Sequence, residues 1–97
     1  MIPRLTRDAK EDLREALRWY RAQALNLDRE FLDCFGSCLS VIATFPDAFA
    51  LVHERVRRAP MRRFPYSVFY MTRGDAFVVV AVWHTRRDPE ALHRRLG

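Results

Sequence analysis

Four arginines surround a proline at the start of the more basic second half of the chain. Arg57 and Arg58 precede Pro60, and Arg62 and Arg63 follow it. Guanidinium groups form paired hydrogen bonds with carboxylates and phosphates, so these proline-flanking arginines predict a surface that binds an anionic partner. The alternative is a solvated sheet edge, because charged side chains also stop edge strands from pairing with other chains.

A second group that could do chemistry stands at the end of the longest apolar run. His84 is followed closely by Arg86 and Arg87. A histidine beside cations could act as general acid or base in RNA cleavage, with the arginines stabilising charge in the transition state. The alternative is a structural histidine whose ring nitrogen bonds the adjoining loop. We refer to these three residues as the His84 group.

Three aromatic side chains are further candidates for contact with a partner. Trp19 lies off the apolar stripe of its helical segment, so it either covers the flank of a helix pair or meets another molecule. Tyr66 and Tyr70 fall on one face of a strand-like run. They could stack on bases or donate protons, whereas packing in the core is the alternative.

The positive charge is concentrated in the second half of the chain. Residues 1–54 carry seven basic and nine acidic side chains, and residues 55–97 carry ten basic and three acidic ones, so the net charge changes from −2 to +7. Lys10 is the only lysine among the seventeen cations. A GC-rich genome would produce the same arginine bias, whereas the clustering favours recognition of phosphate, nucleic acid or an acidic protein.

Several common kinds of site have no signature here. There is no glycine-rich nucleotide loop and no serine-hydrolase elbow, so no cofactor is expected. Cys34 and Cys38 share a helical face on which a mutual disulfide is awkward, and further zinc ligands are absent, so reduced buried thiols and no metal are expected. No run approaches the ~20 apolar residues of a membrane span, and the N-terminus lacks a signal-peptide core, which predicts a cytoplasmic location.

A short strand and a helical hairpin are expected in the first half. The strand covers Ile2–Leu5, and Thr6 is the N-cap of a helix over residues 7–22. Apolar side chains recur at helical spacing through that segment and again, in a wider stripe, through residues 27–45. Asn26 is the expected N-cap of the second helix, which ends before the proline that follows it.

The second half is expected to form a small sheet and a last helix. The expected strands cover residues 49–56, 66–72 and 77–83, with residues 61–64 as a further short candidate. Arg73–Asp75 forms a turn, and Asp88 caps a final helix. The order β-α-α-β-β-β-α, with a helical hairpin packed on a mainly antiparallel sheet, makes the fold α+β.

Four ordered segments of the chain resemble the RelE/ParE toxins of bacterial type II toxin–antitoxin systems. The segments are Ala9–Leu13, Val56–Arg58, Arg63–Tyr70 and Val80–Pro89. The resemblance covers nearly the whole chain and implies one toxin domain over residues 1–97. It also implies neutralisation through direct binding of a cognate antitoxin, whose acidic tail would meet the arginine-rich face. The proline-flanking arginines and Trp19 are therefore expected to bind the antitoxin or the target.

The resemblance leaves two targets open. RelE-type members cut mRNA on the ribosome with basic residues and a C-terminal tyrosine or histidine, and ParE-type members block DNA gyrase. This chain has no tyrosine after Tyr70, so His84 or His93 would have to substitute. Gyrase inhibition is therefore favoured. An endoribonuclease that uses the His84 group is the alternative, as is an inactive member that serves only as an antitoxin partner.

Overall fold

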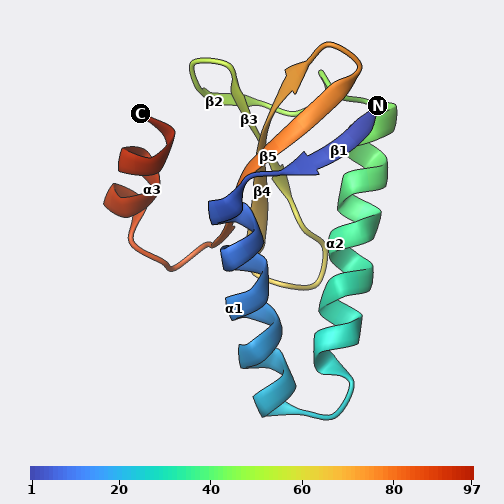
Figure 1. Ribbon diagram of the computed structural model, residues 1–97. Coiled ribbons are helices and arrows are strands. Elements are labelled where there is room, and N and C mark those ends of the chain that lie inside the picture. The colour runs from blue at the N-terminus through green and yellow to red at the C-terminus, as the bar shows by residue number, and fades with distance from the viewer.

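One five-stranded sheet carries helices on both faces (Figure 1). The computed structural model describes residues 1–97. The sheet has the order β1-β5-β4-β3-β2, in which only the β1–β5 pair is parallel. The elements in chain order are β1 (Ile2–Leu5), α1 (Arg7–Gln23), α2 (Leu27–Thr44), β2 (Leu51–His53), β3 (Val56–Pro60), β4 (Tyr66–Arg73), β5 (Ala76–His84) and α3 (Pro89–Leu96). The predicted α+β fold is thus confirmed.

The helix ends follow local sequence signals. The Thr6 hydroxyl accepts a hydrogen bond from the Ala9 N–H at 3.1 Å, and the Asp88 carboxylate accepts one from the Glu90 N–H at 2.9 Å. Both residues were predicted as N-caps. Asn26 also stands at the N-cap position, but its side chain makes no capping bond. Its backbone is left-handed, with φ 66°, which asparagine tolerates better than most residues. It therefore reverses the chain between α1 and α2.

The expected strand over residues 49–56 is wrong, and so is the strand over residues 61–64. Two short antiparallel strands, β2 and β3, replace the first, because Glu54 adopts a φ of 48° and turns the chain between them. The sheet consequently has one strand more than predicted. Residues 61–64 form a bend in which Arg63 has a φ of 72°. Pro60 is the last residue of β3, where a missing N–H is tolerated near the sheet edge.

A bulge in β5 changes which of its residues face each of the two hydrophobic layers. Phe69 pairs with Ala81 while Tyr70 pairs with Val79, which leaves Val80 as an extra residue. An extra residue reverses which side chains face which layer. On both sides of the bulge, therefore, some side chains of β5 face the α1–α2 hairpin. The β5 residues that lie between these positions, and those that lie beyond them, face α3. The strand β1 also ends beside the bulge, with Leu5 opposite Val79.

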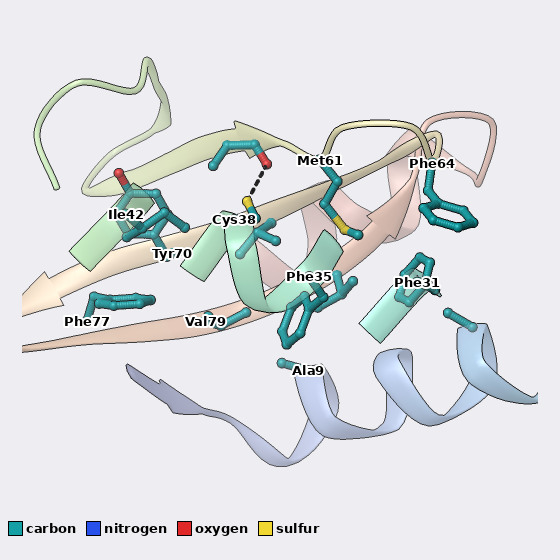
Figure 2. Packing of buried hydrophobic residues seen from close by; sticks show 14 residues of the cluster. Ala9, Phe31, Phe35, Cys38, Ile42, Met61, Phe64, Tyr70, Phe77 and Val79 are labelled. Atoms are coloured by element: carbon teal, nitrogen blue, oxygen red, sulfur yellow. Dashed lines mark hydrogen bonds between the residues drawn. The ribbon is translucent and has the colours of Figure 1, made fainter. Parts of the chain in front are cut away.

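The larger hydrophobic core lies between the hairpin and the sheet, as Figure 2 shows. Phe31 of α2 is fully buried. The centre of its ring lies 5.0–5.2 Å from the ring centres of Tyr20, Phe64 and Tyr66. The smaller cluster, on the other face, joins the sheet to α3. Its four buried members are Val56, Phe69, Ala81 and Trp83. Both faces of the sheet are thus covered by apolar side chains.

The thiol of Cys38 faces the larger core. Its Sγ donates a hydrogen bond to the Ala59 carbonyl at 3.8 Å (Figure 2). Burial raises the pKa of this thiol from 9.0 to about 11, because the thiolate would lose its hydration. Cys34, one turn earlier, is half-buried, and both cysteines are free. None of the three helices combines the length and apolar character needed to cross a bilayer.

Candidate functional site

The proline-flanking arginines do not form one surface. Side chains alternate along a strand, so neighbouring Arg57 and Arg58 of β3 lie on opposite faces of the sheet. On the hairpin side, Arg57 donates to the Phe49 carbonyl at 2.7 Å and pairs with Asp47 at 3.7 Å. On the α3 side, Arg58 lies opposite Phe69 in the register and makes no ion pair. The cluster that the sequence suggested is therefore divided.

The other two members of the set lie in the bend after β3. Arg63 donates to the Glu30 carboxylate at 3.0 Å, which ties the bend to α2, and its guanidinium lies 5.3 Å from the centre of the Phe64 ring. Arg62 is exposed and makes no ion pair. Two of the four guanidinium groups, those of Arg58 and Arg62, are thus available to an acidic partner.

The His84 group is engaged within the protein. The Nδ1 of His84 accepts a hydrogen bond from the Arg86 N–H at 2.9 Å, as the structural alternative requires. Its ring meets that of Tyr66 edge to face at 5.0 Å. Burial is the main cause that raises the pKa of Tyr66. The side chain of Arg87 pairs with Asp12 at 3.4 Å and lies 3.7 Å over the Trp83 ring. Of the three residues, only Arg86 has an exposed guanidinium without an acidic partner.

Asp12 is the residue at the centre of this region, and it was not predicted from the sequence as a site residue. It lies on α1 and is 5% exposed. Its carboxylate accepts from the Val82 N–H at 3.0 Å, pairs with Arg87, and forms a two-pronged ion pair with Arg95 in which one contact is 3.1 Å. The usable signal was its position: it stands three residues after Ala9 on the apolar stripe, where a carboxylate needs partners.

Trp19 is exposed rather than packed over the helix pair. Its side chain is 60% accessible on α1, so it covers little of the hairpin flank. Other large apolar side chains are also exposed on the hairpin, including Leu25 at its tip and Phe45 at the end of α2. By contrast, Tyr66 and Tyr70 pack in or against the larger core. Burial raises the pKa of Tyr70, whose hydroxyl donates to the Pro46 carbonyl at 2.6 Å.

Comparison with known proteins agrees with this architecture. Residues 4–89 match the family described as ParE toxin of type II toxin–antitoxin system, parDE. Toxin ParE2 from two strains of Mycobacterium tuberculosis, CDC 1551 / Oshkosh and ATCC 25618 / H37Rv, is 29% identical over 95 residues, which cover 97% of this chain and 90% of the relative.

A solved structure shares the fold. It is described as the chromosomal ParDE TA system from P. aeruginosa, and it matches with a TM-score of 0.63 at 16% sequence identity, over 89% of this chain and 97% of that one. The family match is the finding that identifies the protein, because it extends from β1 to the start of α3. The chain belongs to the ParE family of toxins of type II toxin–antitoxin systems.

Proposed function

We propose that this chain is a single-domain cytoplasmic toxin that a cognate antitoxin neutralises by direct binding and that inhibits DNA gyrase. The observation that carries the proposal is the family match over residues 4–89. The toxin acts by binding rather than by catalysis, and it needs no cofactor. Its partners are the antitoxin and, when it is free, the gyrase.

The distribution of charge supports an acidic antitoxin segment as the neutralising partner. Residues 55–97 carry a net charge of +7. Within this region Arg58 and Arg62 have no acidic partner, whereas Arg57 and Arg63 are held by Asp47 and Glu30. An antitoxin that supplies carboxylates would meet the free pair first. Exposed Trp19 offers an apolar anchor of the kind that dominates many protein interfaces.

The contacts of the His84 group support the gyrase proposal over RNA cleavage. One of the two ring nitrogens of His84, Nδ1, is bonded to the Arg86 N–H, so only Nε2 could serve as a general acid or base. A cation that stabilises a transition state should be free to meet the phosphate, but Arg87 is paired with Asp12 and stacked on Trp83. No tyrosine follows Tyr70 to replace them.

A supercoiling assay tests the target directly. Purified toxin should inhibit gyrase and trap its cleaved DNA complex, and equimolar antitoxin should reverse both effects. Induction in cells should stop DNA synthesis before protein synthesis. Uninhibited gyrase, together with cut mRNA in a translation extract that His84→Ala abolishes, would establish the endoribonuclease instead. Growth without arrest after induction would indicate an inactive partner of the antitoxin.

The role of the free arginines is tested by antitoxin affinity. Arg58→Gln and Arg62→Gln should each weaken antitoxin binding, by about tenfold if the guanidinium forms a charged hydrogen bond at the interface. Arg73→Gln is the matched control, because it removes the same charge from an exposed position outside the set. If the unaltered chain and the three variants all bind the antitoxin with equal affinity, Arg58 and Arg62 do not lie in the interface.

A further inference from the structure

The outer face of α2 carries no charge along its C-terminal half. Residues 34–46 include no charged side chain, although 30% of the whole chain is charged. The exposed residues in this stretch are Gly36, Ser37, Ser40, Val41, Thr44 and Phe45. In Figure 1, α2 lies at the outer edge of the molecule, and no other element lies on its outer side. We refer to these six residues as the uncharged face.

The other helix of the hairpin has the surface expected of a helix that faces water. Most of the exposed residues of α1 are charged, namely Arg7, Asp8, Lys10, Glu11, Arg14, Glu15, Arg18 and Arg21. A helix that packs on a core through one face normally carries charged and polar side chains on the opposite face. The opposite face of α2 already packs in the larger core through Phe31, Phe35 and Ile42. An uncharged outer face on such a helix therefore indicates contact with another molecule.

Two large apolar side chains stand together on the uncharged face. Val41 is 47% exposed and Phe45 is 61% exposed. They are four residues apart, so they lie one above the other on the same side of the helix. Single exposed apolar residues are common on protein surfaces, whereas neighbouring ones without charged residues among them form a patch suited to binding.

The hydroxyl groups of the uncharged face already have partners within the helix. The Ser40 hydroxyl donates to the Gly36 carbonyl at 3.2 Å, and the Thr44 hydroxyl donates to the Ser40 carbonyl at 2.9 Å. A polar group that is already hydrogen-bonded loses less when water is removed from it. This face can therefore be covered by an apolar surface at little cost.

Gly36 gives another helix room to come close. A glycine inside a helix is less stable than an alanine, and nothing in the protein lies within 4 Å of the place where its Cβ would stand. No contact within the chain therefore requires a glycine here. Gly36, Ser40 and Thr44 follow each other at intervals of four residues and form a ridge of small side chains. Ridges of this spacing on two helices pack into each other's grooves.

The charge of the molecule favours a second copy as the partner. The chain has a net charge of +5, so most pairings of two copies bring arginines together. Contact through the uncharged face avoids this, because it buries no charge on either copy. An acidic partner would find no cation on this face to pair with. The same patch on both copies also satisfies the self-complementarity that a two-fold symmetric dimer requires.

We propose that two copies of this chain form a two-fold symmetric dimer in which the uncharged faces of the two α2 helices pack on each other. Gly36, Ser40 and Thr44 form the centre of the contact, and Val41 and Phe45 cover its side. A helix of this length is about 27 Å long and about 10 Å wide. The contact is thus smaller than the roughly 800 Å² that each partner buries in a stable interface, which gives a weak dimer with a Kd of roughly 10 μM to 1 mM. The inference is independent of the target that the toxin inhibits.

Sedimentation equilibrium of the full-length chain without antitoxin tests the proposal. The average mass should rise from that of one chain towards that of two as the concentration increases through the expected Kd range. Raising the salt concentration should leave the association unchanged or strengthen it, because salt screens the repulsion between the two positively charged copies and an apolar contact has no ion pair to lose.

Matched variants locate the contact. Ser40→Arg places a large cation at the centre and should weaken association by at least about tenfold, whereas Ala22→Arg, which adds the same charge at an exposed position of α1, should change it by less than about threefold. Gly36→Ala should weaken association several-fold, because its methyl group stands between the two helices. The same substitution should leave the melting temperature of the monomer unchanged or raise it, because alanine favours the helix.

Four results would overturn the proposal. They are a single-chain mass at every concentration, association that weakens with salt, equal association in Ser40→Arg and Ala22→Arg, and undiminished association in Gly36→Ala. A monomeric chain whose antitoxin binding or gyrase inhibition is weakened by Ser40→Arg, but not by Ala22→Arg, would also overturn it and assign the uncharged face to that partner.

Discussion

Asp12 on α1 and Arg95 on α3 form an ion pair that joins two helices packed on opposite faces of the sheet. The pair forms beside β5, at the point where β1 has already ended opposite Val79. Asp12 also accepts the Val82 N–H, which no strand on that side can satisfy. One carboxylate thus takes the place of a missing strand and anchors the C-terminal helix.

Replacing Asp12 should strongly destabilise the protein. Asp12→Ala leaves the Val82 N–H without its acceptor and removes the charge that compensates Arg87 and Arg95. Breaking a buried pair on one side costs about 3–5 kcal/mol, a large part of the total for a domain of this size. Urea unfolding should show a lower midpoint with little change in slope.

Glu11→Ala is the matched control for Asp12. Glu11 is the preceding carboxylate on the same helix, and it pairs with exposed Arg14 and Arg18 at 3.3 and 3.4 Å. Surface pairs contribute about 0–1 kcal/mol, so this variant should unfold almost as the unaltered protein does. Similar losses in the two variants would show that the Asp12 network does not stabilise the fold.

Arg95→Gln should loosen α3 more than the rest of the molecule. No residue of α3 is fully buried, so the helix depends on the Asp12 pair and on contacts of Ala91, Leu92 and Leu96 with the smaller cluster. The amides of α3 should exchange with deuterium at least several-fold faster, while those of β4 keep their protection. Arg94→Gln is the control, because Arg94 is exposed and lies 4.0 Å from Asp88. Equal exchange in both variants would contradict the anchoring role.

Elements that depend on neighbours in sequence could be predicted. Thr6 and Asp88 cap their helices because a hydroxyl or carboxylate reaches an N–H only two or three residues away. The apolar run that ends in Trp83 forms a strand because both its faces are covered. The chain reversals at Asn26 and Glu54 could not be predicted in this way. Each residue turns the chain through a left-handed backbone, and neither makes a side-chain hydrogen bond that would mark the turn.

Contacts between distant residues could not be predicted in this way. Asp12 and Arg95 are 83 residues apart, and only the packing of α1 and α3 around β5 brings them together. The arginine cluster shows the converse, since Arg57 and Arg58 are adjacent in sequence but lie on opposite faces of β3. The two-residue period of a strand was the signal that could have separated them. This signal can be used only once it is known that a strand begins at Val56.

Phe31→Ala should cost about 3–5 kcal/mol of folding stability, because it empties the centre of the larger core. The Phe31 ring contacts three other aromatic rings, so the cavity that remains is enclosed by side chains from α1, the bend and β4. Chemical denaturation should show the loss. Leu32→Ala, one residue later on the exposed side of α2, is the control and should cost much less. A small effect of Phe31→Ala would mean that the core collapses to fill the space.

Alkaline pH should destabilise the protein through Cys38. Burial raises the pKa of its thiol from 9.0 to about 11, so between these values the folded chain keeps a proton that the unfolded chain has released. The stabilisation of the folded chain that comes from this pKa difference is complete below pH 9. It is lost as the pH rises towards 11, by at most about 1.4 kcal/mol per pH unit. Urea unfolding across this range should show a shallower decline in Cys38→Ala, whatever the packing cost of that substitution. The buried tyrosines, whose pKa values are also raised, add a decline in both proteins. Parallel stability curves between pH 9 and 10 would exclude Cys38 as the cause.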